Sequence, residues 1–142
     1  MRKDSYGVII MAEEMNGRKI SSGSAEGEAL ISSEGISFYG GVDPETGIVL
    51  EKGHPLEGKS MAGKVLVFPQ GKGSTVGSYT MYRLSKGGKN PVAIINRECE
   101  TIVAVGAIIS EIPCVDKVDI GRIKDGDRVK VDADNAKVIL LD

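Results

Sequence analysis

The chain has 142 residues, 41% of them hydrophobic, which is enough for one domain with one buried core. Its 18 lysine and arginine residues nearly balance 20 aspartate and glutamate residues. Because no large field of one sign is available to attract nucleic acid or an anionic membrane, we expect neither as a partner.

The cysteines and the N-terminus indicate the compartment. Cys99 and Cys114 are the only cysteines and form no paired motif, which disfavours a disulfide framework and a metal site built by this chain alone. The apolar run near the N-terminus is too short for a signal peptide. We therefore expect a cytoplasmic protein with an extension over residues 1–16 and a single domain over 17–142.

The N-terminal half is expected to contain short strands and tight turns. Residues 18–23 and 27–33 have the pattern of strands, and 35–53 has apolar runs on both sides of an Asp-Pro-Glu-Thr-Gly turn. Residues 63–69 form a continuous apolar run that ends at Pro69, which is typical of a strand buried on both faces.

Helices are expected in the second half. After a glycine-rich loop, apolar residues at helical spacing predict a helix over 75–86. Residues 91–96 indicate another buried strand, 100–113 a second helix, and 126–142 a hairpin that turns at 133–135. This order predicts an α/β fold in which β layers from both chain ends surround a central strand–loop–helix unit.

Residues 53–60, GHPLEGKS, match the phosphate-loop pattern. A phosphate loop needs a helix that begins at its lysine and serine, so that backbone N–H groups face the phosphates. Here only Met61 and Ala62 separate Ser60 from the next strand region. We interpret the segment as a turn, and we expect its His54, the only histidine, to be an exposed loop residue without a catalytic partner.

Residues 71–77, GKGSTVG, partly match a dinucleotide-binding fingerprint, because they follow a strand, open a helix and space three glycines. Two observations disfavour this interpretation. A β-rich region precedes the unit, and the next strand ends in Asn96-Arg97 rather than in an acidic residue for a ribose. A nucleotide-binding module stays open as an alternative.

The same loop brings Ser74 to an expected helix start. Unpaired backbone N–H groups and the helix dipole stabilise negative charge there, so a serine oxygen can act as a base once water is excluded. A serine at this position equally serves as a helix cap, without any chemistry. Gly71, Gly73 and Gly77 would let the backbone approach a ligand closely. The residues alone leave both roles of Ser74 open.

Long blocks across residues 17–141 resemble the small subunit of the aconitase X type of dehydratases. The blocks span residues 23–30, 36–49, 54–78, 93–116 and 126–131. The resemblance implies a swivelling β/β/α domain, like the mobile domain of aconitases, on a separate polypeptide. It also implies a heterodimer with a large catalytic subunit, whose own cysteines hold a [4Fe–4S] cluster, while this chain binds no metal.

The resemblance further implies a hydro-lyase that is active only with its large subunit. The implied reaction removes water from (R)-5-phosphomevalonate, a hydroxy acid, to give trans-anhydromevalonate 5-phosphate in the archaeal mevalonate pathway. Ser74 matches the glycine-flanked serine that is the general base in the related family. Lys72, Gly73 and Thr75 would line the substrate pocket.

One feature departs from ordinary aconitases, which continue after the serine with Ser-Arg-Glu-His. Here Thr75-Val76-Gly77-Ser78 follow, so the carboxylate-binding arginine of that stretch is absent. Relatives that dehydrate hydroxyproline share the implied architecture. A hydroxyproline dehydratase subunit therefore stays open as a second alternative.

Overall fold

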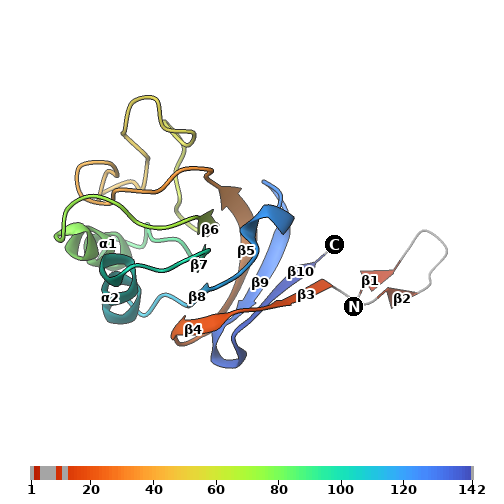
Figure 1. Cartoon of the computed structure of the whole chain (residues 1–142). Coiled ribbons are helices and arrows are strands. Elements are labelled where there is room, and N and C mark those ends of the chain that lie inside the picture. The colour runs from red at the N-terminus through yellow and green to blue at the C-terminus, as the bar shows by residue number, and fades with distance from the viewer. Residues whose placement is uncertain (1, 4–8, 11–12, 142) are drawn as a thin grey trace.

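An eight-stranded sheet, covered on one side by two helices, forms the body of the protein (Figure 1). The computed structural model describes residues 2–3, 9–10 and 13–141. The sheet consists of β3 (Glu13–Asn16), β4 (Arg18–Ser21), β5 (Ser24–Ile31), β6 (Val65–Phe68), β7 (Ala93–Asn96), β8 (Cys114–Asp116), β9 (Arg128–Asp132) and β10 (Lys137–Leu141). The helices are α1 (Gly77–Lys86) and α2 (Thr101–Ile109), with 3-10 turns η1 (Ile120–Arg122) and η2 (Ala133–Asn135). Outside this body, β1 (Arg2–Lys3) pairs with β2 (Ile9–Ile10).

The strand order is β3-β10-β9-β5-β6-β7-β8-β4, and β5 is the strand at which the sheet changes character. Its residues 24–28 pair antiparallel with β9, and its residues 29–31 pair parallel with β6. The parallel strands β6, β7 and β8 are linked by α1 and α2, as parallel connections require. One sheet therefore supplies two β layers.

The two edges of the sheet are consecutive in the chain. β3 pairs with β10 at one edge and β4 pairs with β8 at the other, and only Gly17 separates them. The sheet thus wraps round toward closure, which removes exposed edges. Four residues of the predicted extension over 1–16 form β3, so residues 13–16 are part of the sheet.

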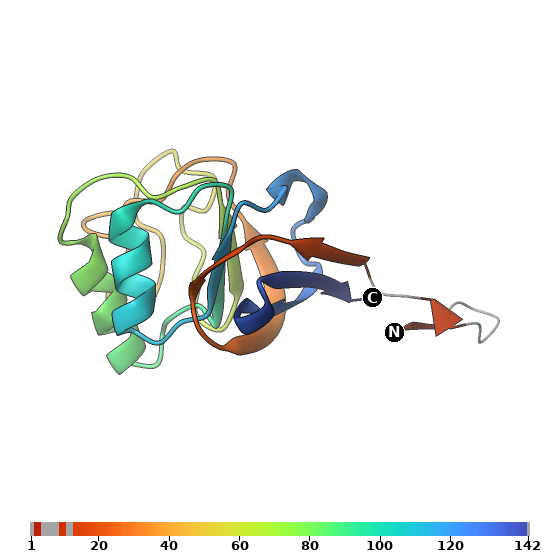
Figure 2. The same ribbon diagram turned by 60° about the horizontal axis from the view of Figure 1, so that its bottom comes forward.

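Two hydrophobic clusters occupy the two sides of the central strands. Leu66 and Phe68 of β6 pack with residues of α1 and α2 in one cluster. Val65 and Val67 pack with Val129 and other residues of the opposite β layer in the second cluster. Figure 2 shows α1 and α2 side by side on their face of the sheet. This β/β/α arrangement confirms the predicted α/β fold class.

Most of the predicted elements are confirmed. The strands predicted over 18–23, 27–33, 63–69 and 91–96, the helices over 75–86 and 100–113, and the C-terminal hairpin over 126–142 correspond to β4, β5, β6, β7, α1, α2 and β9–β10. β3 was not predicted because its four residues include a single apolar one, Met15, and β8 was not predicted because three residues are too short to display a period.

The prediction of two strands within 35–53 is wrong. The predicted turn exists, since the Asp43 carbonyl accepts hydrogen bonds from the N–H groups of Thr46 and Gly47. Its flanks, however, form only isolated bridges, such as Val42 with Val49. Four of their apolar side chains, those of Ile36, Phe38, Val42 and Val49, are buried in the cluster that also contains residues of α1 and α2, so packing rather than a hydrogen-bonded ladder holds the segment beside α1 (Figure 1).

We expect Gly17→Ala to lower the free energy of unfolding by about 1–3 kcal/mol, through overpacking. A Cβ at Gly17 would lie 2.5 Å from the Asp116 carbonyl oxygen and 2.6 Å from Val115 Cγ1. Gly87→Ala is the matched control, because the Cβ would have only an ordinary contact, 3.6 Å from the Arg83 carbonyl oxygen. Urea denaturation measures both, and equal stability of the two variants would contradict a tight joint at Gly17.

Candidate active site

Ser74 opens a tight turn between β6 and α1. Its carbonyl accepts a hydrogen bond from the Gly77 N–H at 3.0 Å, and its Oγ accepts one from the Val76 N–H at 3.3 Å. This combination is a β-turn with a serine side chain bonded two residues ahead. The Val76 N–H therefore points at the oxygen on which negative charge would form.

Ser74 is not the cap of α1. The helix begins at Gly77, its N-cap residue is Val76, and no side chain caps it. The expected position of Ser74 at the helix start is thus wrong by two residues, because the β-turn precedes the helix. Of the two roles left open by the sequence, the one as a helix cap is excluded by this geometry.

The predicted site residues form one exposed stretch, residues 72–75. The Lys72 ammonium lies 3.0 Å from the Glu51 carboxylate, with 45% and 34% of the two side chains exposed. The Thr75 carbonyl accepts a hydrogen bond from the Ser78 hydroxyl at 3.4 Å. Lys72 is consequently tied to the 35–62 segment, while the Ser74 hydroxyl faces solvent.

Two of the loop glycines are required by the protein's own packing. At Gly73 φ is +92°, and a Cβ would lie 2.3 Å from Ser37 Oγ. At Gly71 a Cβ would lie 2.5 Å from Glu100 Oε1. At these two positions the space that a side chain would need is therefore occupied by Ser37 and Glu100.

Glu100 fixes the element behind the loop. Its carboxylate accepts hydrogen bonds from the N–H groups of Ile102 and Val103, at 3.0 and 2.8 Å, and caps α2. No sequence pattern identifies Glu100, Ser37 or Glu51 as neighbours of the site. Of the three, only Glu100 could have been noticed, because an acidic residue directly before a helical pattern is typical of a helix cap.

His54 is buried, so the expectation of an exposed loop histidine is wrong. Only 5% of the residue is exposed. Its Nδ1 accepts a hydrogen bond from the Leu56 N–H, so the proton lies on Nε2, which donates to the Gly35 carbonyl; both distances are 3.0 Å. His54 thus ties 53–56 to residue 35. The segment 53–60 contains turns and bridges, in agreement with its interpretation as a turn.

The cysteines do not fit an iron–sulfur cluster. Cys114 is buried in β8 and Cys99 is half-buried. The hydrogen bond with the Cys99 thiol, together with burial, raises the pKa of Cys114 well above its usual value, whereas a cluster ligand must be a thiolate. Within the described residues no three His, Cys, Asp or Glu side chains gather into a potential metal site.

The fold and the loop together define a class of protein: a swivel-type β/β/α domain that presents a glycine-flanked serine at the carboxyl end of a central parallel strand. The chain belongs to the aconitase X swivel domain family, whose model matches residues 14–140. This confirms the resemblance seen in the sequence.

Curated relatives share this chain's length. The phosphomevalonate dehydratase small subunit of Thermococcus kodakarensis is 57% identical over 129 residues, which cover 91% of this chain and 97% of the relative. The protein of the same name from Methanosarcina acetivorans is 60% identical over 131 residues, covering 90% and 91%.

Solved structures agree with the fold. The crystal structure of Thermococcus kodakaraensis aconitase X in its holo-form matches with a TM-score of 0.90 at 57% identity, over 92% of this chain and 99% of that one. The solution NMR structure of a UPF0107 protein matches with a TM-score of 0.84 at 52% identity, over 92% and 100%.

In the part of the chain that the structure describes, no helix has the length and apolar character needed to cross a membrane.

The raised pKa of Cys114 makes stability fall at alkaline pH. Above about pH 9 the unfolded thiol loses its proton while the native one keeps it, so the free energy of unfolding decreases by up to about 1.4 kcal/mol per pH unit. Urea denaturation of wild type and Cys114→Ala from pH 7 to 10 checks this. The difference in free energy of unfolding between the wild type and Cys114→Ala should become smaller above pH 9. A constant difference would contradict a raised pKa of Cys114.

Proposed function

We propose that this chain is the small subunit of a hydro-lyase that dehydrates (R)-5-phosphomevalonate to trans-anhydromevalonate 5-phosphate, with Ser74 as its general base. The observation that carries the proposal is the exposed Ser74 hydroxyl, which meets the Val76 N–H on the loop that follows β6. The chain is a member of the aconitase X swivel domain family. The names of its relatives, which it covers over 97% and 91% of their length, support the enzyme class and the substrate.

The proposed role of Ser74 is to take the proton next to the substrate's carboxylate. A serine oxygen is a poor base in water, so it needs donors that stabilise negative charge and a site from which water is excluded. The Val76 N–H and the nearby N-terminus of α1 supply the first condition. In this chain Ser74 is exposed, so a second protein surface must supply the other condition.

Lys72 is proposed to bind one of the two anionic groups of the substrate. In the free chain its ammonium pairs with Glu51, but both side chains are partly exposed. Pairs of this kind contribute only about 0–1 kcal/mol. A carboxylate or phosphate can therefore displace Glu51. Gly73 and Thr75, on either side of Ser74, would contribute backbone groups to the same pocket.

The second surface is proposed to be a large subunit in a heterodimer. The relatives' name, small subunit, implies such a larger partner. A [4Fe–4S] cluster held by that subunit would supply Lewis-acid chemistry at the leaving hydroxyl. We place the complex in the cytoplasm as part of the same proposal.

The alternatives receive less support. A nucleotide pyrophosphate against the glycine loop would meet the Glu100 carboxylate, whose Oε1 lies 2.5 Å from the Cβ position of Gly71. Repulsion between the pyrophosphate and this carboxylate disfavours the nucleotide-binding module. No contact in the described structure favours hydroxyproline over a phosphorylated hydroxy acid.

Ser74→Ala is expected to lower kcat of the complex reconstituted with the large subunit by about 100- to 10,000-fold, the range of general-base catalysis. The rate of phosphomevalonate dehydration is measured from the amount of product formed. Ser78→Ala is the matched control, since the Ser78 hydroxyl only donates to the Thr75 carbonyl in the same loop. The control should keep kcat within about threefold of wild type. Full activity of Ser74→Ala would exclude Ser74 as the base.

Lys72→Met is expected to raise KM by about tenfold, equivalent to 1.4 kcal/mol of lost binding, with a smaller effect on kcat. Glu51→Gln removes the same ion pair but leaves the ammonium free, so it should leave KM unchanged or lower it. Steady-state kinetics of the reconstituted complex distinguish the two variants. If both raise KM equally, the ion pair matters for the loop's shape and Lys72 does not bind substrate.

A further inference from the structure

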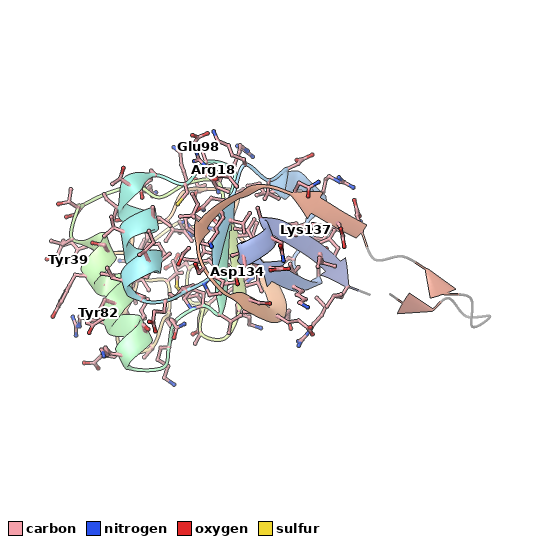
Figure 3. The ribbon with its side chains drawn as sticks, turned by 90° about the horizontal axis from the view of Figure 1, so that it is seen from below. Arg18, Tyr39, Tyr82, Glu98, Asp134 and Lys137 are labelled. Atoms are coloured by element: carbon pink, nitrogen blue, oxygen red, sulfur yellow. The ribbon has the colours of Figure 1, made fainter. Side chains whose placement is uncertain are left out.

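A groove of about 510 Å³ lies between α1 and the 35–53 segment. It is lined by Tyr39, Gly40, Pro44, Val76, Tyr79, Thr80 and Arg83. Val76, Tyr79 and Arg83 follow one another at spacings of three and four residues, so they form one stripe along α1. Figure 3 shows Tyr39 on the α1 side of the molecule.

The groove exposes large apolar side chains. Tyr39 is 59% exposed, Tyr79 62% and Val76 45%, although the chain has only 4% aromatic residues. Tyr79 does not belong to the core face of α1, which is formed by other residues, among them Met81 and Leu84. An aromatic stripe that faces solvent and carries an arginine has the composition of an interaction hot spot.

Arg83 is the single charged residue of the groove, and it forms no ion pair with the described part of the chain. The next basic residue on α1 behaves differently, since the Lys86 ammonium lies over the Tyr82 ring at 5.3 Å. A partner that fits the groove therefore presents an apolar edge next to a carboxylate.

The groove is continuous with the Ser74 loop. Val76 lines the groove and donates its N–H to Ser74 Oγ. On the other side, Ser37 lies against Gly73 and donates its hydroxyl to the Tyr39 carbonyl at 3.1 Å. A stable interface covers about 800 Å² on each partner, far more than a loop of a few residues. A subunit that covers Ser74 must extend over neighbouring surface, and the groove adjoins it.

We propose that this groove docks the large subunit, with Tyr39 and Tyr79 as apolar anchors and Arg83 paired with an acidic side chain of that subunit. The inference rests on the proposed function, because it takes the occupant to be the subunit that completes the Ser74 site. A second exposed apolar stripe, formed by Val105, Ile108 and Ile109 of α2, has no such connection to the loop and supplies the control.

The experiment titrates a fixed amount of large subunit with small-subunit variants and follows dehydration of phosphomevalonate. Tyr79→Ser and Tyr39→Ser should each raise the half-saturating concentration at least tenfold and keep the plateau rate. Arg83→Glu should raise it further than Arg83→Ala, because it repels the acidic partner group. Ser74→Ala should behave in the opposite way, with tight association measured by isothermal titration and a lost plateau.

Ile109→Ser is the matched control, since Ile109 is a 49% exposed apolar residue at the C-terminal end of α2. It should leave the half-saturating concentration unchanged. Unaltered association of both tyrosine variants, or an equal loss in Ile109→Ser, would overturn the docking site. Thermal melting identifies any unfolded variant, for which Tyr79→Phe and Tyr39→Phe replace the serine variants. These should weaken association by less than threefold if the rings provide the contact.

These outcomes separate the two proposals. If the groove is not the docking site, the tyrosine variants still associate tightly with the large subunit, and turnover still requires Ser74. Failure of the proposed function gives no phosphomevalonate turnover with wild-type subunits, while association measured by isothermal titration still tests the groove.

Discussion

The packing of the 71–77 loop against the start of α2 is the contact on which the candidate site depends. Glu100 binds the first N–H groups of α2 and at the same time fills the space in which Gly71 would carry a side chain. On the other flank, Gly73 lies against Ser37. The loop is therefore held from both sides although its own side chains are exposed. A reactive hydroxyl on a loop needs this kind of support to keep its geometry.

The sequence predicted the elements whose burial is regular. β6 and β7 are buried on both faces, so they appear as continuous apolar runs, and the hairpin of β9 and β10 alternates because one face is exposed. The same reasoning gave a wrong prediction for the 35–53 segment. Its buried apolar residues, Ile36, Phe38, Val42 and Val49, enter one cluster from an irregular path, and apolar runs beside a turn do not distinguish such a path from a hairpin.

The site was less predictable than the fold, because its neighbours come from distant positions. Glu51, Ser37 and Glu100 lie more than twenty residues from Ser74 along the chain, and only the folded structure places Ser37 and Glu100 against its loop. His54 failed for a similar reason, since both of its partners are backbone groups that leave no mark in a sequence pattern. Local chemistry left Ser74 as either base or cap. The family resemblance selected the base, and the β-turn excludes the cap.

Val76 would connect the proposed docking with the proposed role of Ser74 as a base. Its N–H donates a hydrogen bond to Ser74 Oγ, and its side chain lines the groove. A subunit that packs on the Val76 side chain also restricts the peptide N–H on which a charged serine oxygen relies. The same contact excludes water from the turn, which strengthens that hydrogen bond because the local dielectric constant falls. If both proposals hold, the free chain keeps a solvated and inactive hydroxyl, and the basicity of Ser74 becomes a property of the assembled heterodimer.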